Sequence, residues 1–562
     1  MRKFATEPFL VGILLLVGAL TFYYFAVLRV DYNRTALFDL DPHPDATEYF
    51  AQAKALLKDR WPSIRIGYNQ LPSRYPLGYP VLMLPWLKIL PATDSILAPF
   101  RTNQTLGLLL LLAVFAFYTY LAMPLTGGLA ALLLATLPGF FTFCRSSISE
   151  ISASLLIVLA FMFAYLGLKE ERRWKIYASA LFLGLSLNIR IQSLFFTPLL
   201  LAMALFPVRG TRLRWFLHCA AIPIVFLLAA SPMLVLNIIQ FCSLSKTGYD
   251  FWVPATSEQD VRFSLRYIPT NANALWREFA LLPRQYYAAN LFGTGTSFVP
   301  AFIFLVCTGF VFIRFNRFFI CSLLAALSSF VALLSYKFGA DNRFYLPFLM
   351  LLVAVAVLPL RWAARNLFAK RRIIGSLAVL VLLAAACLGF PSRSGYNTGD
   401  IYRSQAWDAI HFPDPPSQPT QFAVQWRFAK LLKQQPGIVL SDIDPVYLNA
   451  LLPDSFVAAP IDGNHRYHRN ESWHYDRPQA LALVEHGLEQ SLPIYALFVS
   501  ADEMIAKRSR LPAIPGYEWY LLNKSLTEPA ILRLAPVGTD GDRTTNGIMH
   551  FGAFSRLVDS EV

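Results

Sequence analysis

Long runs of apolar residues constrain this chain more than any other feature of its sequence. A helix needs roughly 20 consecutive apolar residues to cross the hydrocarbon core of a bilayer. One such run, FLVGILLLVGALTFYYFAVL, occupies residues 9–28, and others follow as far as residue 390. Charged residues make up 15% of the chain, whereas soluble proteins average about 25%. We therefore predict a polytopic α-helical membrane protein.

Hydropathy predicts about eleven transmembrane helices. The first is expected to remain uncleaved, because its apolar stretch is too long for a signal peptide and runs on to Arg29 without a clear cleavage site. Arg190 and Gln192 interrupt a later apolar stretch, which we divide there into two spans. The predicted spans are 8–29, 102–121, 125–143, 151–168, 175–189, 191–207, 215–239, 293–313, 318–336, 344–361 and 373–390.

The distribution of Lys and Arg predicts the orientation of these spans. Basic residues gather in the short connections 169–174, 208–214, 314–317 and 362–372. Cytoplasmic loops are enriched in Lys and Arg, so the N-terminus and these connections are predicted to be cytoplasmic. An odd number of spans then sends the C-terminus outside. The same topology explains the net charge of +14 without a nucleic-acid partner.

The chain is predicted to have two domains. Residues 1–390 form a transmembrane catalytic domain with two outer loops, 30–101 and 240–292, and residues 391–562 form an extracytoplasmic domain. This tail alternates between strand-like and helix-like patterns, which indicates a small α/β domain. Its predicted strands are 437–442, 493–500 and 530–536, and its predicted helices are 422–435 and 477–490.

An acidic motif, FDLDPHPDATEYF, follows the first span at residues 38–50. Asp45 with Glu48 fits a capping box at the start of an amphipathic helix, which is the commonest use of such residues. The functional alternative makes Asp45 a catalytic carboxylate held at the start of that helix. Asp39 and Asp41 precede it. The residues alone leave both interpretations open, and they are compatible with each other.

Four segments together resemble the GT-C superfamily, the polytopic glycosyltransferases that include protein O-mannosyltransferases and lipid A aminoarabinose transferases. The acidic motif is followed by RYPLGYP (74–80) before a short apolar helix that is re-entrant or interfacial. Glu150 lies in RSSISEISASLL, Arg190 in LGLSLNIRIQSLFF, and Arg343 in FGADNRFYLPF. The charge-based topology puts all of these on one side of the membrane.

The resemblance implies an inverting transfer of a sugar from a polyprenyl-phosphate donor to a hydroxyl group of a lipid, glycan or protein at the outer face. It assigns catalysis to Asp45, as general base, and to Glu150. Cations would bind the donor phosphate, although arginines near lipid headgroups also snorkel without a function. The predicted phosphate-binding residues are Arg190, Arg343, Lys337 and Arg74, and the predicted substrate contacts are Glu48, Tyr49, Tyr75 and Tyr345.

A cofactor is not determined by the sequence. Carboxylates suit hard divalent cations, so Asp45 and Glu150 are the predicted ligands if a metal is used. We expect an integral protein of the bacterial plasma membrane. A polysaccharide polymerase or ligase is the nearest alternative function. A secondary transporter is a more distant one, because no internal repeat is visible and the candidate charges gather at one face. A non-catalytic membrane scaffold is a third.

Overall fold

The computed structural model describes residues 8–29, 44–58, 60–204, 211–252, 262–279, 298–313, 316–366, 437–441, 445–451, 455–461, 477–498, 501–522 and 530–537. The chain divides into two compact units. The helical unit comprises Met1–Asp39, Pro99–Leu236 and Thr256–Pro415, and the mixed unit comprises Leu40–Ala98, Asn237–Ala255 and Pro416–Val562. The predicted division at residue 390 stays a prediction. Asp39, Asp41 and the predicted span 373–390 lie outside the described residues.

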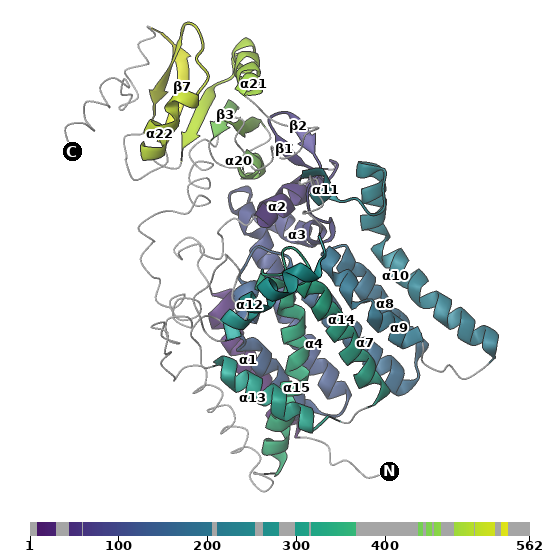
Figure 1. Ribbon diagram of the computed structural model, residues 1–562. Helices are drawn as coiled ribbons and strands as arrows, with labels where there is room; N and C mark the ends of the chain where they lie inside the picture. The colour runs from purple at the N-terminus through teal and green to yellow at the C-terminus, as the bar shows by residue number, and fades with distance from the viewer. Residues whose placement is uncertain are drawn as a thin grey trace. The chain divides into compact units, whose positions relative to one another are not determined.

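Helices make up the described part of the helical unit (Figure 1). They are α1 (Phe9–Tyr23, continued by a π-helical turn, Tyr24–Leu28), α4 (Ala98–Tyr120), α5 (Pro124–Ala135), α6 (Pro138–Cys144), α7 (Glu150–Glu170), α8 (Arg173–Leu187), η4 (Ile191–Phe196), α9 (Pro198–Ala204), α10 (Arg212–Phe241), η6 (Leu265–Tyr267), α12 (Ile268–Phe279), α13 (Phe298–Val311), α14 (Arg317–Leu334), η7 (Asn342–Tyr345) and α15 (Leu346–Asn366).

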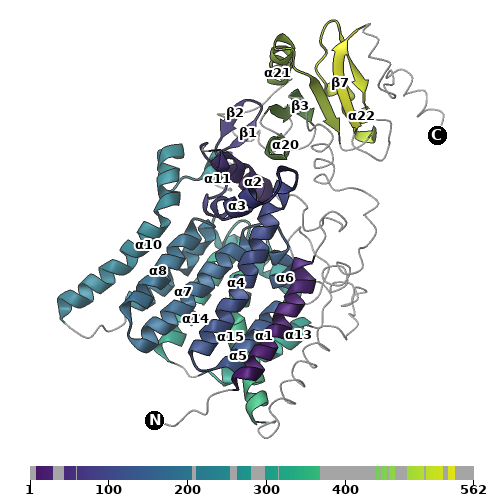
Figure 2. The ribbon, with the colours of Figure 1, turned by 180° about the vertical axis from the view of Figure 1, so that it is seen from behind.

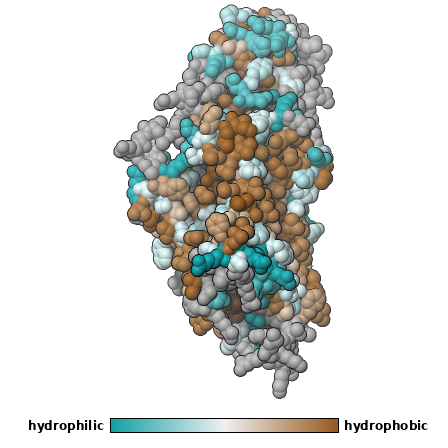
Figure 3. Space-filling view, turned by 90° about the vertical axis from the view of Figure 1, so that its right-hand side faces the viewer, coloured by the Kyte–Doolittle hydropathy of each residue, from teal (hydrophilic) through white to brown (hydrophobic). Residues whose placement is uncertain are grey.

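Among the described residues, five helical segments are long and apolar enough to cross a membrane. They are Phe9–Leu28, Ser95–Tyr120, Glu150–Glu170, Arg212–Phe241 and Arg343–Arg365. On α10 the side chains of Phe216, Leu228 and Val235 are 62%, 68% and 50% exposed. Figure 3 shows a broad hydrophobic area on one face of the molecule. Such a surface suits lipid, because soluble monomers rarely expose large apolar patches.

Two predicted spans are interrupted by local chemistry. Residues 125–143 form two helices, α5 and α6, because Pro138 cannot continue a helix that precedes it and instead starts the next one. Residues 191–207 begin as the 3₁₀ turn η4 before α9. Figure 2 shows α1 beside α5. Glycines permit this close contact, since a Cβ atom added at Gly128 would lie 2.4 Å from the carbonyl oxygen of Gly12.

The mixed unit combines three segments that are far apart in the sequence. The first contains α2 (Pro44–Leu57), a hairpin of β1 (Ile64–Ile66) and β2 (Asn69–Leu71), α3 (Gly78–Ile89) and η3 (Ala92–Leu97). The second contains α11 (Gly248–Trp252). The third contains β3 (Gly437–Ser441), α20 (Pro445–Leu451), β4 (Phe456–Pro460), α21 (Arg477–Glu489), β5 (Ile494–Phe498), α22 (Ala501–Lys507), η10 (Arg508–Arg510), β6 (Tyr517–Leu521) and β7 (Ala530–Pro536).

The C-terminal segment forms a five-stranded mixed sheet in the order β4-β3-β5-β7-β6. Strand β3 runs parallel to β4 and β5, whereas β7 runs antiparallel to β5 and β6. The predicted strands 437–442, 493–500 and 530–536 and the predicted helix 477–490 are confirmed. The predicted helix 422–435 lies outside the described residues. An α/β arrangement in this region is thus present.

One apolar core joins the three segments of the mixed unit. Ile64 and Ile66 of β1 and Trp252 of α11 pack with sheet residues such as Ile438 and Phe498. Asn449 of α20 adds polar links within this unit. Its amide donates to the backbone carbonyl oxygens of Arg65 and Ala458, each at 2.8 Å, and its oxygen accepts from the Ala458 N–H at 2.8 Å. The first loop and the C-terminal sheet therefore fold as one body.

Candidate functional site

Asp45 is a buried carboxylate in the first turn of α2. The helix begins at Pro44, whose fixed φ suits the first helical position. The predicted N-cap role is therefore wrong, because Asp45 already lies inside the helix. Its side chain is only 5% exposed, and Oδ1 accepts a hydrogen bond from the hydroxyl of Tyr75. A negative charge in the first turn is also favoured by the helix dipole.

Glu48, one turn further along α2, anchors the segment that carries Tyr75. Its carboxylate is fully buried. It accepts from Ser73 Oγ at 2.8 Å, from the Arg74 N–H at 2.8 Å and from Arg74 Nε at 2.6 Å, and it forms an ion pair with the Arg74 guanidinium. This bonding replaces the capping box that the sequence predicted. The roles predicted for Glu48 in substrate binding and for Arg74 in phosphate binding stay predictions.

Aromatic rings enclose the hydroxyl that faces Asp45. The ring of Tyr75 lies 5.0 Å from that of Tyr49 and 5.4 Å from that of Tyr249, and Tyr49 lies 5.1 Å from Tyr79. Burial, followed by the negative charge of Asp45, raises the pKa of Tyr75 well above its ordinary value of 10.0. Tyr75 therefore stays protonated and keeps donating to the carboxylate throughout the physiological pH range.

Helix α11 holds residues 72–75 in place. Trp252 is 1% exposed, and its indole N–H donates to the carbonyl oxygen of Pro72 at 2.6 Å. A Cβ atom added at Gly248 would lie 1.9 Å from the carbonyl oxygen of Ser73. The two backbones therefore touch, which only glycine permits at this position. The acid cluster, which we define as Asp45, Glu48, Ser73, Arg74 and Tyr75, is thus supported from a second loop.

A second set of charges lies in the helical unit and is centred on Glu150. This residue starts α7 and is 3% exposed. Its Oε1 forms an ion pair with Arg190, in the break between α8 and η4, and lies 3.5 Å from Nε of Arg343. Asp341 Oδ2 lies 2.5 Å from that same nitrogen. The structure thus unites three predicted residues, Glu150, Arg190 and Arg343, and adds Asp341; we call these four residues the arginine cluster.

Phe344 packs between the two arginines of this cluster. The guanidinium carbons of Arg190 and Arg343 lie 4.9 and 5.3 Å from the centre of its ring. A cavity of about 20 Å³ adjoins Glu150, Arg190, Arg343 and Phe344, which is room for about one water. Oε2 of Glu150 is buried and has no hydrogen-bond partner among the described residues. A small polar group can therefore be accepted here.

Two other predicted residues lie close to this cluster in the sequence. Tyr345 is 3% exposed, and its hydroxyl donates to the carbonyl oxygen of Gly339 at 3.1 Å. Lys337 follows α14, and its Nζ lies 5.9 Å from the centre of the Phe338 ring. Sequence inspection missed Asp341 and Phe344 as partners, although both belong to the quoted FGADNRFYLPF segment. Acidic and aromatic residues beside an arginine are the signal that was available.

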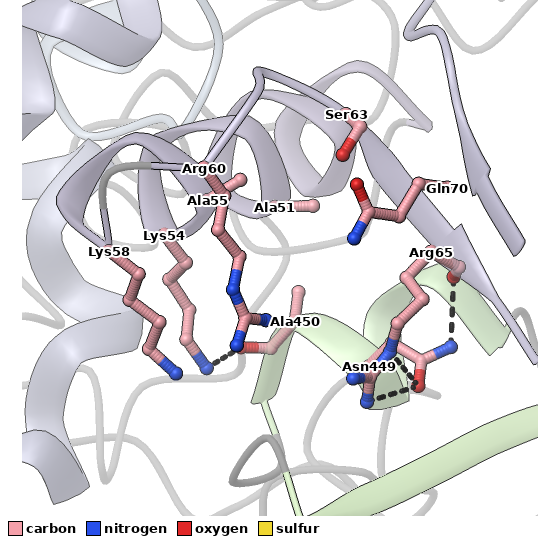
Figure 4. Close-up of a pocket in the computed structure, with 10 residues that line it drawn as sticks. All are labelled: Ala51, Lys54, Ala55, Lys58, Arg60, Ser63, Arg65, Gln70, Asn449 and Ala450. Carbon is pink, nitrogen blue, oxygen red and sulfur yellow. Dashed lines mark hydrogen bonds between the residues drawn. The ribbon is translucent and has the colours of Figure 1, made fainter. Parts of the chain in front are cut away.

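A basic cleft in the mixed unit was also missed. Four cations line a cavity of about 50 Å³ together with Ser63, Gln70 and Asn449 (Figure 4); they are Lys54, Lys58, Arg60 and Arg65. Two of these cations contact residues of α20. Lys54 Nζ donates to the carbonyl oxygen of Ala450, and Arg65 Nη2 donates to Asn449 Oδ1 at 3.1 Å. These contacts attach α2 and β1 to α20.

The residues that the structure describes contain no group of three or more His, Cys, Asp or Glu side chains able to hold a metal ion. Asp45 belongs to the mixed unit and Glu150 to the helical unit. The prediction that these two carboxylates share a divalent cation therefore stays a prediction.

These observations define a class of protein. The sequence motifs predicted a GT-C fold. The structure has a bundle of apolar helices, an α/β unit and an acid at the start of the first loop helix, as that prediction requires. No protein-family model matches the chain, and no curated protein matches it by sequence.

Solved structures share this fold along most of their length. The crystal structure of ArnT from Cupriavidus metallidurans bound to undecaprenyl phosphate is similar with a TM-score of 0.57 and 13% identity, covering 93% of this chain and 97% of that one. The structure of the same ArnT in the apo state is similar with a TM-score of 0.55 and the same identity and coverage. The Archaeoglobus fulgidus oligosaccharyltransferase in the apo form is similar with a TM-score of 0.50 and 14% identity, covering 94% of this chain and 75% of that one. The chain is thus an integral membrane protein with the GT-C fold.

Proposed function

We propose that the chain is an inverting glycosyltransferase that transfers a sugar from a polyprenyl-phosphate donor to a hydroxyl acceptor. The observation that carries this proposal is the buried carboxylate of Asp45, held by Tyr75 at the start of α2. It occurs in a fold shared with an ArnT that binds undecaprenyl phosphate and with an oligosaccharyltransferase. Fold alone does not determine activity, so the acid cluster is needed to support the assignment.

Asp45 acts as the general base in this proposal. It accepts the proton of the acceptor hydroxyl while that oxygen attacks the anomeric carbon. The bond from the anomeric carbon to the phosphate oxygen breaks, and the lipid phosphate leaves with the electron pair. A single displacement inverts the anomeric centre. A positioned base typically contributes about 10²–10⁴-fold to the rate.

The arginine cluster binds the donor phosphate in this proposal. Two guanidinium groups held by Glu150 and Asp341 are already oriented before the substrate arrives. Arginine suits phosphate because its planar group can donate two parallel hydrogen bonds. Preorganised cations stabilise the charge that develops on the leaving group. Glu150 acts here as the residue that orients both arginines.

The remaining predicted residues have supporting roles. Glu48 and Arg74 hold Ser73 and Tyr75 against α2, and Tyr49 packs on Tyr75. Tyr345 and Lys337 lie beside the arginine cluster in sequence. We further propose that the acid cluster faces the exterior or periplasm of a bacterial plasma membrane, where lipid-linked sugars replace nucleotide sugars. The acceptor is a hydroxyl of a lipid, glycan or protein.

The first test is sugar transfer in liposomes that contain a panel of polyprenyl-phosphate sugars. We expect the wild type to transfer one of these sugars. Asp45→Asn should lose at least about 10²-fold of the rate while retaining donor binding, because its base is lost and its shape is kept. Asp502→Asn is the matched control, since Asp502 is exposed on α22. A chelator added to the same assay tests the predicted divalent cation.

Each other outcome contradicts a particular part of the proposal. Full activity of Asp45→Asn would remove Asp45 as the base. Transfer of long glycan blocks in place of single sugars would favour a polymerase or ligase. Flux of a solute across sealed vesicles without any transfer would favour a transporter.

A further inference from the structure

A large apolar cavity lies in the helical unit, and it runs from beside the arginine cluster toward the other end of the helices. Its volume is about 590 Å³, and its walls come from α4, α5, α7, α13, α14 and α15. One water needs roughly 10–15 Å³ of such volume, and protein interiors contain few voids larger than a water. Val114, Leu134, Phe161 and Phe330 are typical of the lining. A space of this size and character suits an apolar occupant.

The length of the cavity matches a hydrocarbon chain. Along α14 it is lined from Phe318 to Phe330, which corresponds to about 18 Å at a rise of 1.5 Å per residue. Half of a bilayer core is about 15 Å thick. The cavity also reaches Met123 at the start of α5 and Tyr165 near the end of α7. It therefore extends to the end of the helical unit opposite Glu150, which begins α7.

One polar atom in this apolar wall lacks a partner. Oγ of Ser322 is buried and makes no hydrogen bond among the described residues, and Ser322 lines the cavity little more than one turn after the start of α14. A buried hydroxyl without a partner costs free energy. An ester carbonyl at this depth would accept its hydrogen bond, whereas the hydrocarbon of an isoprenoid offers no oxygen.

Two cations lie near the same end of the cavity. Nζ of Lys169 lies 5.7 Å from the centre of the Tyr165 ring, and Arg361 interacts electrostatically with Tyr118. Both tyrosines line the cavity. Basic residues close to a membrane surface attract anionic lipids. The end with the unpartnered hydroxyl is therefore also suited to a negatively charged headgroup.

We propose that this cavity binds an anionic glycerophospholipid from the leaflet at that end of the helical unit. One acyl chain fills the cavity, its ester carbonyl accepts from Ser322, and its phosphate lies near Lys169 and Arg361. The headgroup end of this site lies near the end of α7, opposite Glu150, and the proposal does not depend on the proposed transfer reaction.

Lipid binding to the full chain in detergent tests the proposal, with phosphatidylglycerol as the probe and native mass spectrometry as the readout. Ala326 lines the cavity, so Ala326→Phe should occupy part of it and weaken binding about tenfold, as overpacking commonly costs 1–3 kcal/mol. Leu324→Phe is the matched control on the same helix, because Leu324 is 60% exposed and does not line the cavity. It should bind like the wild type.

Two further comparisons do not depend on whether Ala326→Phe folds. The wild type should bind ester-linked phosphatidylglycerol about fivefold more tightly than its ether-linked analogue, and Ser322→Ala should remove this difference. Lys169→Gln should lower the preference for phosphatidylglycerol over phosphatidylcholine about fivefold.

Three results would overturn the proposal. One is equal binding of the ester and ether lipids together with no preference for phosphatidylglycerol over phosphatidylcholine. A second is that the protein binds undecaprenyl phosphate in place of phosphatidylglycerol and that Ala326→Phe weakens this binding. That result would assign the cavity to an isoprenoid chain. A third is the absence of any bound lipid, which would indicate that a segment of the protein itself fills the space.

Discussion

Asp45 and Tyr75 form a buried carboxylate–phenol pair, and this pair makes the proposed base testable at the scale of single residues. The hydrogen bond from Tyr75 favours the ionised carboxylate. Tyr75→Phe should therefore make protonation of Asp45 easier. Because the reaction needs an ionised base, the acidic limb of the pH–rate profile should move to higher pH.

The control for this prediction is Tyr68→Phe, which changes a tyrosine that is 52% exposed and lies in the turn between β1 and β2. Its pH–rate profile should coincide with that of the wild type. An unchanged acidic limb in Tyr75→Phe, with normal folding, would mean that Asp45 does not limit the rate as a base.

Glu150 gives a second prediction at the residue scale, and its readout is stability. Arg190 and Arg343, whose side chains are only 11% and 9% exposed, share this carboxylate, so Glu150→Gln leaves their charge without that compensation. Removing one partner of a buried ion pair typically costs about 3–5 kcal/mol. We expect a loss of this order in the free energy of unfolding, measured by denaturant titration in detergent.

Glu170→Gln is the comparison for Glu150→Gln. Glu170 pairs with Lys175 at 2.5 Å, but its side chain is 27% exposed, and exposed pairs are worth only about 0–1 kcal/mol. Equal losses in the two variants would show that the charge of Glu150 is not needed to hold Arg190 and Arg343.

At the scale of elements, the contact between α11 and the Ser73–Arg74 backbone supports the acid cluster from a distant segment. Gly248→Ala would place a methyl group against the Ser73 carbonyl, so α11 and residues 72–75 must separate. We expect a loss of about 1–3 kcal/mol in stability and a lower rate of transfer with donor binding retained. Thermal unfolding and the liposome assay measure these two effects.

Ser245→Ala is the control for Gly248→Ala, because Ser245 is exposed in the same segment. It should change neither measurement. If Gly248→Ala retained both wild-type stability and rate, the acid cluster would not depend on α11.

The success of sequence-based prediction also differs between elements. Apolar runs predicted β3, β5 and β7, since buried strands are continuously apolar. Strand β6 (YEWYL) was missed because it is a partly exposed edge strand with a mixed pattern. The joining of α2 and β1 to α20 was also missed, because contacts such as Arg65 with Asn449 leave no local periodicity.

The same distinction holds for the candidate site. Glu150, Arg190 and Arg343 were predicted from segments that resemble the GT-C superfamily, and Arg190 also because a charge within an apolar run stands out. Asp45 was singled out by its motif, but the pairing of Glu48 with Arg74 depends on how the loop folds back on α2. Residue type could be predicted from the sequence, whereas pairing required the three-dimensional fold.

At the scale of the whole molecule, the proposed chemistry depends on the orientation in the membrane. Basic connections predict that the loop between α7 and α8 is cytoplasmic and that residues 240–292 are external. Cys242 is exposed and belongs to the mixed unit, as Asp45 does. With the other five of the six native cysteines replaced, a membrane-impermeant maleimide should label Cys242 in intact cells. In a cysteine-free background, Arg172→Cys, at an exposed position between α7 and α8, should be labelled only after permeabilisation. The opposite pattern would place Asp45 on the cytoplasmic side, where nucleotide sugars are available, and would remove the reason for a lipid-linked donor.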